Sequence, residues 1–314
     1  MSTTELKAPA ATVRKLRSRT AASTRPSWSK APSIPIRVSK AIAVIVLCLV
    51  ILFPLLIVVS TSLSTAESLR QNGGFAIIPT SFSIEAYRQV LSGGVVSRAV
   101  VISLLVTIVG TAISLICTVL AAYALSRKGS LFQKPLLGLV LLTFLFTPGL
   151  IPVYLMVKQL GLLDTYWSLI LPGAVSAFNI VIVRGFFQNI PQELIDSAKI
   201  DGASEWRTLW SIMLPLSKAV VAVVGLFYAV GYWNSFFNAL IYLQDSSKWT
   251  LQLVLRSYVL QGAPLLTDTG TVVDTPTAAI QMAVIVIAMV PVLCAYPFVQ
   301  RHMSAGVMTG AVKG

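Results

Sequence analysis

Residues 99–123 read AVVISLLVTIVGTAISLICTVLAAY, without a single charged side chain. A helix rises about 1.5 Å per residue and the hydrocarbon core of a bilayer is about 30 Å thick, so about 20 apolar residues can cross it. A helix also satisfies its own backbone hydrogen bonds, which the bilayer interior requires. This stretch therefore predicts a membrane-spanning helix and sets the fold class of the whole chain.

The composition extends this prediction to the rest of the 314 residues. Hydrophobic residues make up 56% of the chain and charged residues 11%, whereas an ordinary soluble domain has about 25% charged residues. We therefore predict an all-α integral membrane protein with six transmembrane helices. The six stretches that qualify are approximately Ala41–Ser60, Ala99–Tyr123, Pro135–Val157, Tyr166–Phe187, Leu216–Leu240 and Thr277–Val299. Thr147-Pro148-Gly149 is expected to kink the third stretch, and Pro172-Gly173 breaks the fourth.

The distribution of basic residues predicts the orientation. The net charge is +13, and nine of the 24 Lys and Arg residues lie in residues 1–40, beside one acid, Glu5. If this tail is cytoplasmic, the inner segments carry 18 basic residues and the outer segments six. This bias predicts that both termini are cytoplasmic. The protein should lie in the cell (plasma or inner) membrane, with a disordered basic tail at 1–40 and a six-span transmembrane domain at 41–314.

Two alternatives concern the basic residues. The composition of residues 1–40 also fits a cleaved targeting peptide, although we favour the disordered cytoplasmic tail. Outside this tail, no basic stripe interleaved with aromatic residues is present in the sequence. A nucleic-acid partner is therefore not expected.

The residue types available limit the chemistry. All eleven acids fall in loops or at span ends, whereas proton-coupled and sodium-coupled carriers often keep carboxylates inside their spans. The three cysteines lie in apolar runs and His302 is the only histidine, so no metal or catalytic site is expected. The sequence has no G-x4-G-K-[ST] phosphate loop. These features leave three possible functions: transport powered by an external energy source, passive flow through a channel, or a structural role.

Neutral polar and aromatic side chains in the spans are candidates for a substrate path. Amide groups and aromatic rings suit a sugar, which offers hydroxyl groups and apolar ring faces. The fifth stretch also contains the pair Tyr228 and Tyr232, which share one helix face. Ordinary helix packing or interfacial anchoring is the alternative interpretation. The candidates are Phe146, Asn179, Tyr228, Trp233 and Asn234.

Residues 190–215 form a loop between the fourth and fifth stretches. Pro191 can begin a short helix and Asp201-Gly202 can end it, and a second helix then runs to Pro215. Leu194, Ile195 and Ala198 are expected to form a small apolar face on the first helix. A short helix exposed between two spans has no core of its own, so a partner is expected to cover it.

This loop resembles the cytoplasmic coupling loop of ATP-binding-cassette (ABC) importer permeases, which has the E-A-A form E-A-A-x3-G-x9-I-x-L-P. The matching residues are Asp196-Ser197-Ala198, Gly202, Ile212 and Leu214-Pro215. Asp196 replaces Glu and Ser197 replaces Ala. Residues 148–191 and 226–243 resemble the carbohydrate-uptake (maltose-type) branch, and are most similar to permeases for complex oligosaccharides, including those that contain uronic acids. The resemblance covers approximately residues 75–314.

The resemblance implies the type I ABC importer permease fold and a role in sugar import by alternating access. It implies four partners besides the lipid bilayer: a different second permease subunit, two copies of a cytoplasmic ATPase, an extracytoplasmic solute-binding protein and the sugar. The ATPases would bind ATP, so the chain itself would bind no cofactor and would not be an enzyme. The residues expected to couple to the ATPase are Glu193, Asp196, Ser197, Ala198, Asp201, Gly202 and Ala203.

Other functions remain open from the sequence. A passive channel or a secondary carrier for a polar solute would work without ATPases, and a non-transporting scaffold would use the loop only to recruit a partner. Polyols and glycerol phosphates are the alternative substrates within the importer interpretation.

Overall fold

The computed structural model describes residues 34–79, 81–92, 94–127, 129, 132–261 and 277–310. Within these ranges the chain is helical, and its only β-type pairing is an isolated antiparallel bridge between Ser64 and Phe82. The helices are α1 (Ile34–Ser62), α2 (Ala66–Gln71), α3 (Glu85–Leu91), α4 (Val95–Ser126), α5 (Gln133–Leu145), α6 (Leu150–Gln159), α7 (Trp167–Ile170), η1 (Leu171–Gly173), α8 (Ala177–Gln188), α9 (Gln192–Ile200), α10 (Glu205–Thr208), η2 (Leu209–Met213), α11 (Leu214–Leu216), α12 (Lys218–Trp233), α13 (Phe237–Tyr242), η3 (Ser246–Lys248), α14 (Leu251–Gln261) and α15 (Thr277–Gly310).

The described residues contain three helices long and apolar enough to cross a membrane, namely α1, α4 and the part of α15 from Ala278 to Ala295. Three further helix pairs qualify together but are bent at short breaks. The bend is 116° between α5 and α6, 50° between Trp167–Gly173 and α8, and 84° between Glu205–Leu216 and α12. The predicted all-α membrane fold is confirmed. The predicted number of six spans is obtained only if each bent helix pair forms one span.

The breaks occur where the sequence removes helix hydrogen bonds. α5 ends at Leu145 and α6 begins at Leu150, so the predicted kink at Thr147-Pro148-Gly149 is a complete interruption. Pro148 has no N–H to donate and constrains the residue before it. In the fourth stretch, the Ser176 hydroxyl restarts the helix by accepting a hydrogen bond from the Asn179 backbone N–H at 3.4 Å.

The first helix differs from the predicted boundary of the basic tail. α1 begins at Ile34, so residues 34–40 are its first turns, whereas residues 1–33 of the predicted tail lie outside the described residues. The chain divides into two compact units, and the boundary in the sequence lies between Phe53 and Pro54. In the first unit, the apolar side chains of α1 are exposed, from Ile42 to Phe53. Such a surface suits contact with lipid.

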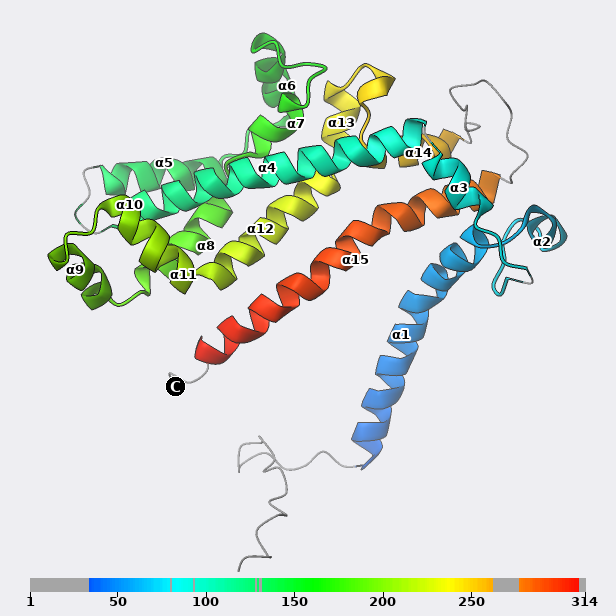
Figure 1. Ribbon diagram of the computed structural model, residues 1–314, viewed down its shortest axis with the longest axis horizontal. Helices are drawn as coiled ribbons and strands as arrows, with labels where there is room; N and C mark the ends of the chain where they lie inside the picture. The colour runs from blue at the N-terminus through cyan, green and yellow to red at the C-terminus, as the bar shows by residue number, and fades with distance from the viewer. Residues whose placement is uncertain are drawn as a thin grey trace, which may run out of the picture. The chain divides into compact units, whose positions relative to one another are not determined.

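The second unit is built around α4. This helix packs against α12 on one side and α8 on another, and α15 packs against α12 and α3 (Figure 1). Within this unit, α9 and α10 lie near the C-terminal end of α4, whereas α3, α13 and α14 lie toward its N-terminal end (Figure 1). α4 therefore connects the loop that contains α9 with the opposite end of the unit.

A buried set of hydroxyl groups joins α4 to α12. The Tyr232 hydroxyl lies 2.8 Å from the Ser114 Oγ and donates to the Ile170 carbonyl at 3.0 Å. One turn away, the Tyr228 hydroxyl lies 2.7 Å from the Thr118 Oγ1. The predicted shared face of Tyr228 and Tyr232 is therefore the face that packs on α4. We call these contacts between Ser114, Thr118, Tyr228 and Tyr232 the α4–α12 seam.

We expect Tyr232→Phe to destabilise the seam by about 1 kcal/mol, the usual size of a hydrogen bond between membrane helices. The substitution keeps the ring but removes the bonds to Ser114 and the Ile170 carbonyl. Thermal unfolding in mild detergent measures the loss. A double-mutant cycle provides the control, since Ser114→Ala should cost less in the Tyr232→Phe background. Equal costs in both backgrounds would contradict the pairing.

Candidate functional site at the loop of residues 190–215

The backbone of the loop that is expected to couple to an ATPase is fixed by hydrogen bonds at the end of α9. α9 ends at Ile200, and Gly202 adopts the left-handed conformation with φ of 75°. The Ala203 N–H donates to the Ala198 carbonyl at 2.9 Å, and the Gly202 N–H donates to the Lys199 carbonyl at 3.0 Å. These two bonds form a Schellman motif, which satisfies the last carbonyls of the helix and favours glycine at its left-handed position. The E-A-A glycine is therefore explained by backbone geometry.

The apolar face of α9 is narrower than the sequence predicts. Ile195 and Ala198 are buried and belong to the inward side. Leu194, expected on the same face, is 45% exposed. Ile195 and Ala198 share one side of the helix, whereas Leu194 is rotated by about 100° from Ile195 and lies at the edge of that side. Leu194 and Ile200, which is 87% exposed, are therefore apolar groups presented to solvent or to a partner.

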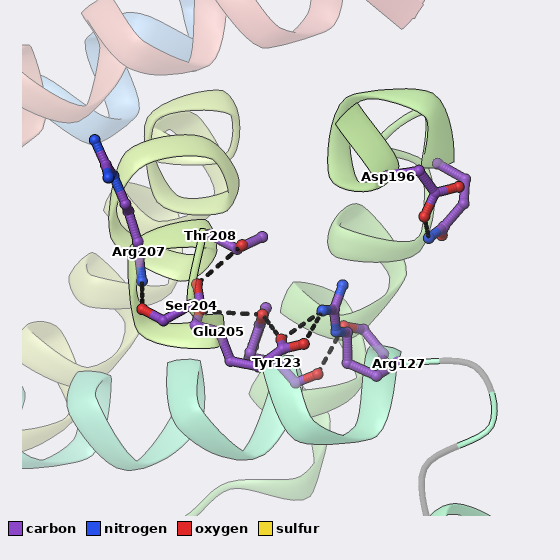
Figure 2. Close-up of polar contacts among 9 residues, drawn as sticks. Tyr123, Arg127, Asp196, Ser204, Glu205, Arg207 and Thr208 are labelled. Atoms are coloured by element: carbon purple, nitrogen blue, oxygen red, sulfur yellow. Dashed lines mark hydrogen bonds and ion pairs between the residues drawn. The ribbon is translucent and has the colours of Figure 1, made fainter. Parts of the chain in front are cut away.

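The residues predicted for coupling lie in α9 and directly after it, and they differ in burial. Ala198 is buried and Ala203 is half-buried. The Asp196 carboxylate accepts a hydrogen bond from the Gln192 amide at 3.2 Å (Figure 2). The outer surface of the loop therefore combines carboxylates with exposed apolar side chains. The exposed members of the predicted set are Glu193, Asp196, Ser197, Asp201 and Gly202.

The second half of the loop is fixed to the end of α4. The Ser204 hydroxyl begins α10 by accepting a hydrogen bond from the Arg207 N–H at 3.3 Å. The next residue, Glu205, accepts hydrogen bonds from the Tyr123 hydroxyl and from the Arg127 guanidinium, whose Nη2 lies 2.5 Å from Glu205 Oε1 (Figure 2). We call Tyr123, Arg127 and Glu205 the α4–α10 clamp. Tyr123 and Arg127 are one helical turn apart in the sequence, but nothing in the sequence pattern links them to Glu205.

A cavity of about 640 Å³ lies beneath α9. Arg127, Glu193 and Lys199 are among its lining residues, together with Phe187 and Met213. Within the described ranges, no group of three or more His, Cys, Asp or Glu side chains could hold a metal ion. The cavity lining combines charged and apolar side chains.

The predicted substrate-path residues are not gathered at one place. Phe146 and Asn234 are exposed, whereas Asn179 is buried. The Tyr228 hydroxyl is part of the α4–α12 seam, and the Trp233 indole donates to the Ala288 carbonyl at 3.0 Å. Tyr228 and Trp233 also belong to different buried clusters. In this structure, the polar atoms of both residues are engaged in helix packing.

Asp164 joins two loops at the other end of the second unit. Its carboxylate accepts hydrogen bonds from the backbone N–H groups of Gln244 and Asp245, at 3.1 and 3.0 Å, and from the Lys248 ammonium at 2.5 Å. The Asp164 N–H donates to the Tyr242 carbonyl at 2.8 Å. The hydrogen bond from Lys248 lowers the pKa of Asp164, with the Asp245 N–H as the next contribution.

This lowered pKa predicts a pH dependence. Ionised Asp164 should hold the loop fully above the ordinary Asp pKa of about 3.9 and lose this contribution as the pH falls through the lowered pKa. Hydrogen exchange at the Gln244 and Asp245 amides should therefore accelerate, relative to the intrinsic rate, only in acid. In Asp164→Asn, these amides should exchange faster at neutral pH. Unchanged protection in this variant would contradict the role of the carboxylate.

The amino-acid sequence of this chain matches a known protein family. Residues 114–308 match the binding-protein-dependent transport system inner membrane component family. The chain belongs to this family. It is therefore a transport permease rather than an enzyme, and it is a subunit of an ABC importer. The channel, carrier and scaffold alternatives are not supported.

Two relatives and one solved structure are similar to this permease over most of its length. It is 44% identical over 269 residues to the polygalacturonan/rhamnogalacturonan transport system permease protein YtcP of Bacillus subtilis, covering 85% of this chain and 94% of YtcP. It is 46% identical over 265 residues to Protein LplC of the same organism, covering 84% and 90% of the two chains. A solved bacterial ABC transporter involved in the import of the acidic polysaccharide alginate matches with a TM-score of 0.78 and 28% identity, covering 87% of this chain and 99% of that one.

Proposed function

We propose that this permease subunit imports oligosaccharides that contain uronic acids. The observation that supports this most strongly is its similarity, along most of its length, to two transport proteins whose names specify acidic polysaccharides. The net charge of +13 does not oppose an anionic substrate. Neutral oligosaccharides, polyols and glycerol phosphates are the substrates from which this proposal must be distinguished.

We infer that the loop at 190–215 docks on a cytoplasmic ATPase. Support comes from its E-A-A spacing, from the exposed carboxylates of α9 and from exposed Leu194 and Ile200. Two ATPase copies would move this loop and the matching loop of a different second permease subunit. The spans would then alternate between inward-facing and outward-facing states, with both termini cytoplasmic and a solute-binding protein delivering the sugar from outside.

Purification from mild detergent tests the assembly. The tagged chain should retain a second permease and an ATPase, and both should be lost when residues 193–206 are scrambled. A scrambled outer segment, residues 66–71, is the control, since α2 lies outside the loop and should leave the ATPase bound. Recovery of the folded chain alone, from membranes that contain the other subunits, would count against the coupling role.

Reconstituted vesicles test the substrate. The complete complex, with its binding protein, should take up labelled oligogalacturonides when ATP is supplied, and a non-hydrolysable ATP analogue should abolish this uptake. Maltooligosaccharides of the same length are the neutral control. Faster uptake of the neutral sugars than of the acidic ones would contradict the proposed substrate class without affecting the assignment to importers.

A further inference from the structure

We propose that the α4–α10 clamp transmits the movement of the ATPase-docked loop to α4, with Glu205 as the positioning residue. This inference rests on the proposed function, because it assumes that an ATPase moves the loop. Glu205 is the first residue of α10 and is directly connected through the loop backbone to the end of α9. Along the backbone toward α10, movement of α9 therefore reaches α4 through Glu205, while Ile195 provides a separate apolar contact between α9 and the core.

The clamp is a two-sided contact rather than a lone surface ion pair. The Tyr123 hydroxyl contacts both the carboxylate of Glu205 and its backbone carbonyl, the latter at 3.2 Å. The Arg127 guanidinium contacts both carboxylate oxygens and also lies over the Tyr123 ring, 5.2 Å from its centroid. A charged hydrogen bond that is held from two directions is stronger and more directional than an exposed pair.

Arg127 is the less accessible member of the pair. Its side chain is 16% exposed, whereas that of Glu205 is 59% exposed. Withdrawal of Glu205 would leave the guanidinium in a mostly desolvated position without this carboxylate, which is unfavourable. Glu205 can regain water more readily. Separation of α10 from α4 is therefore unfavourable mainly because Arg127 would lose its partner in a poorly hydrated position.

The α4 end of the clamp is attached to two further helices. The Leu125 carbonyl accepts hydrogen bonds from Arg184 Nε of α8 at 2.9 Å and from Gln133 Nε2 of α5 at 2.8 Å. The Tyr123 ring meets the Phe187 ring edge-to-face, with 6.4 Å between the centroids. A displacement of α10 that keeps the clamp closed must therefore move the last turn of α4 together with its contacts on α5 and α8.

The other connection of α4 leads into the membrane domain. Ser114 and Thr118 lie nine and five residues before Tyr123 in α4, and they bond to Tyr232 and Tyr228 of α12. α4 is continuous between the seam and the clamp. A helix of this kind transmits displacement as a rigid element, so the clamp provides a continuous physical connection from the loop to α12.

The proposal is tested in the complete complex with Glu205→Gln and Arg127→Gln, each of which keeps a hydrogen-bonding side chain but removes the ion pair. We expect the ATPase to copurify at the wild-type level. The ratio of sugar imported to ATP hydrolysed should fall about fivefold to tenfold. The charge exchange Glu205→Arg with Arg127→Glu should restore part of that ratio, because it recreates the pair, which a merely structural loss would not allow.

The matched control is Lys134→Gln. Lys134 is an exposed cation of α5 that lies outside the loop at 190–215 and outside the clamp, so the transport ratio of this variant should stay within twofold of the wild type. Loss of the ATPase in the Glu205→Gln complex would overturn the proposal, since the residue would then serve docking. An unchanged ratio in both clamp variants would also overturn it. If the wild-type complex itself imports no sugar with ATP, the proposed function fails instead.

Discussion

Gly202→Val reduces ATP-driven uptake by about tenfold or more while the chain stays in the membrane. The expected loss arises from the backbone, because Gly202 has a φ of 75°. A residue with a β-carbon loses about 1–2 kcal/mol in this conformation, and a β-branched residue loses more. Relief of this strain would break the bonds to the Ala198 and Lys199 carbonyls, which set the direction of the chain from α9 to α10.

Two variants at the same position separate backbone strain from crowding. A β-carbon at Gly202 would meet nothing within 4 Å, so Gly202→Asn should retain most uptake because asparagine tolerates the left-handed conformation. Gly202→Ala should fall between Asn and Val. Uptake is measured with the reconstituted complex, and membrane levels are compared by immunoblotting. Wild-type uptake by the Val variant would show that the helix ending is not needed for coupling.

Gly110→Ala lowers the thermal midpoint of the purified chain by several degrees. A β-carbon at Gly110 would lie 2.9 Å from ring atoms of Tyr232. The ring cannot move away easily, because its hydroxyl bonds to Ser114 and to the Ile170 carbonyl. Overpacking of this kind costs about 1–3 kcal/mol, and each kcal/mol shifts the midpoint of a chain of this size by about 2–4 °C.

Gly185→Ala is the control for this second prediction. Gly185 lies in α8, and a β-carbon there would meet nothing within 4 Å. Alanine also favours a helix by up to about 1 kcal/mol relative to glycine, so this variant should unfold at the same temperature or higher. Thermal unfolding of both variants in the same detergent gives the comparison. Equal midpoints would contradict the close approach of α12 to Gly110.

Local chemistry made several features predictable. Uncharged apolar runs such as residues 99–123 predict spans because the bilayer excludes charge and unsatisfied backbone groups. Proline and glycine located the interruption near Pro148 and the end of α9 near Gly202. The motif spacing of the loop at 190–215 indicated the family without reference to the fold. Each of these inferences depends on residues that are neighbours in the sequence.

Other local inferences were incomplete for physical reasons. Pro148 predicted a kink in the third stretch, but the size of the bend, 116°, depends on the tertiary packing around it, such as that of α5 against α4 and α8. Tyr228 and Trp233 suit a sugar by residue type, yet their polar atoms bond to Thr118 and to the Ala288 carbonyl. Hydropathy cannot distinguish a polar group that lines a path from one that joins two helices, since both are tolerated in a span.

The sequence by itself determined that the chain crosses the membrane, where its coupling loop lies and which family it resembles, because hydropathy, turn residues and motif spacing are local properties. Only the tertiary structure decided which distant groups meet. Glu205 bonds to Tyr123 across 82 positions, Lys248 to Asp164 across 84 and Tyr232 to Ser114 across 118. Such pairings depend on the relative positions and rotations of packed helices, which arise from the whole core rather than from any one segment.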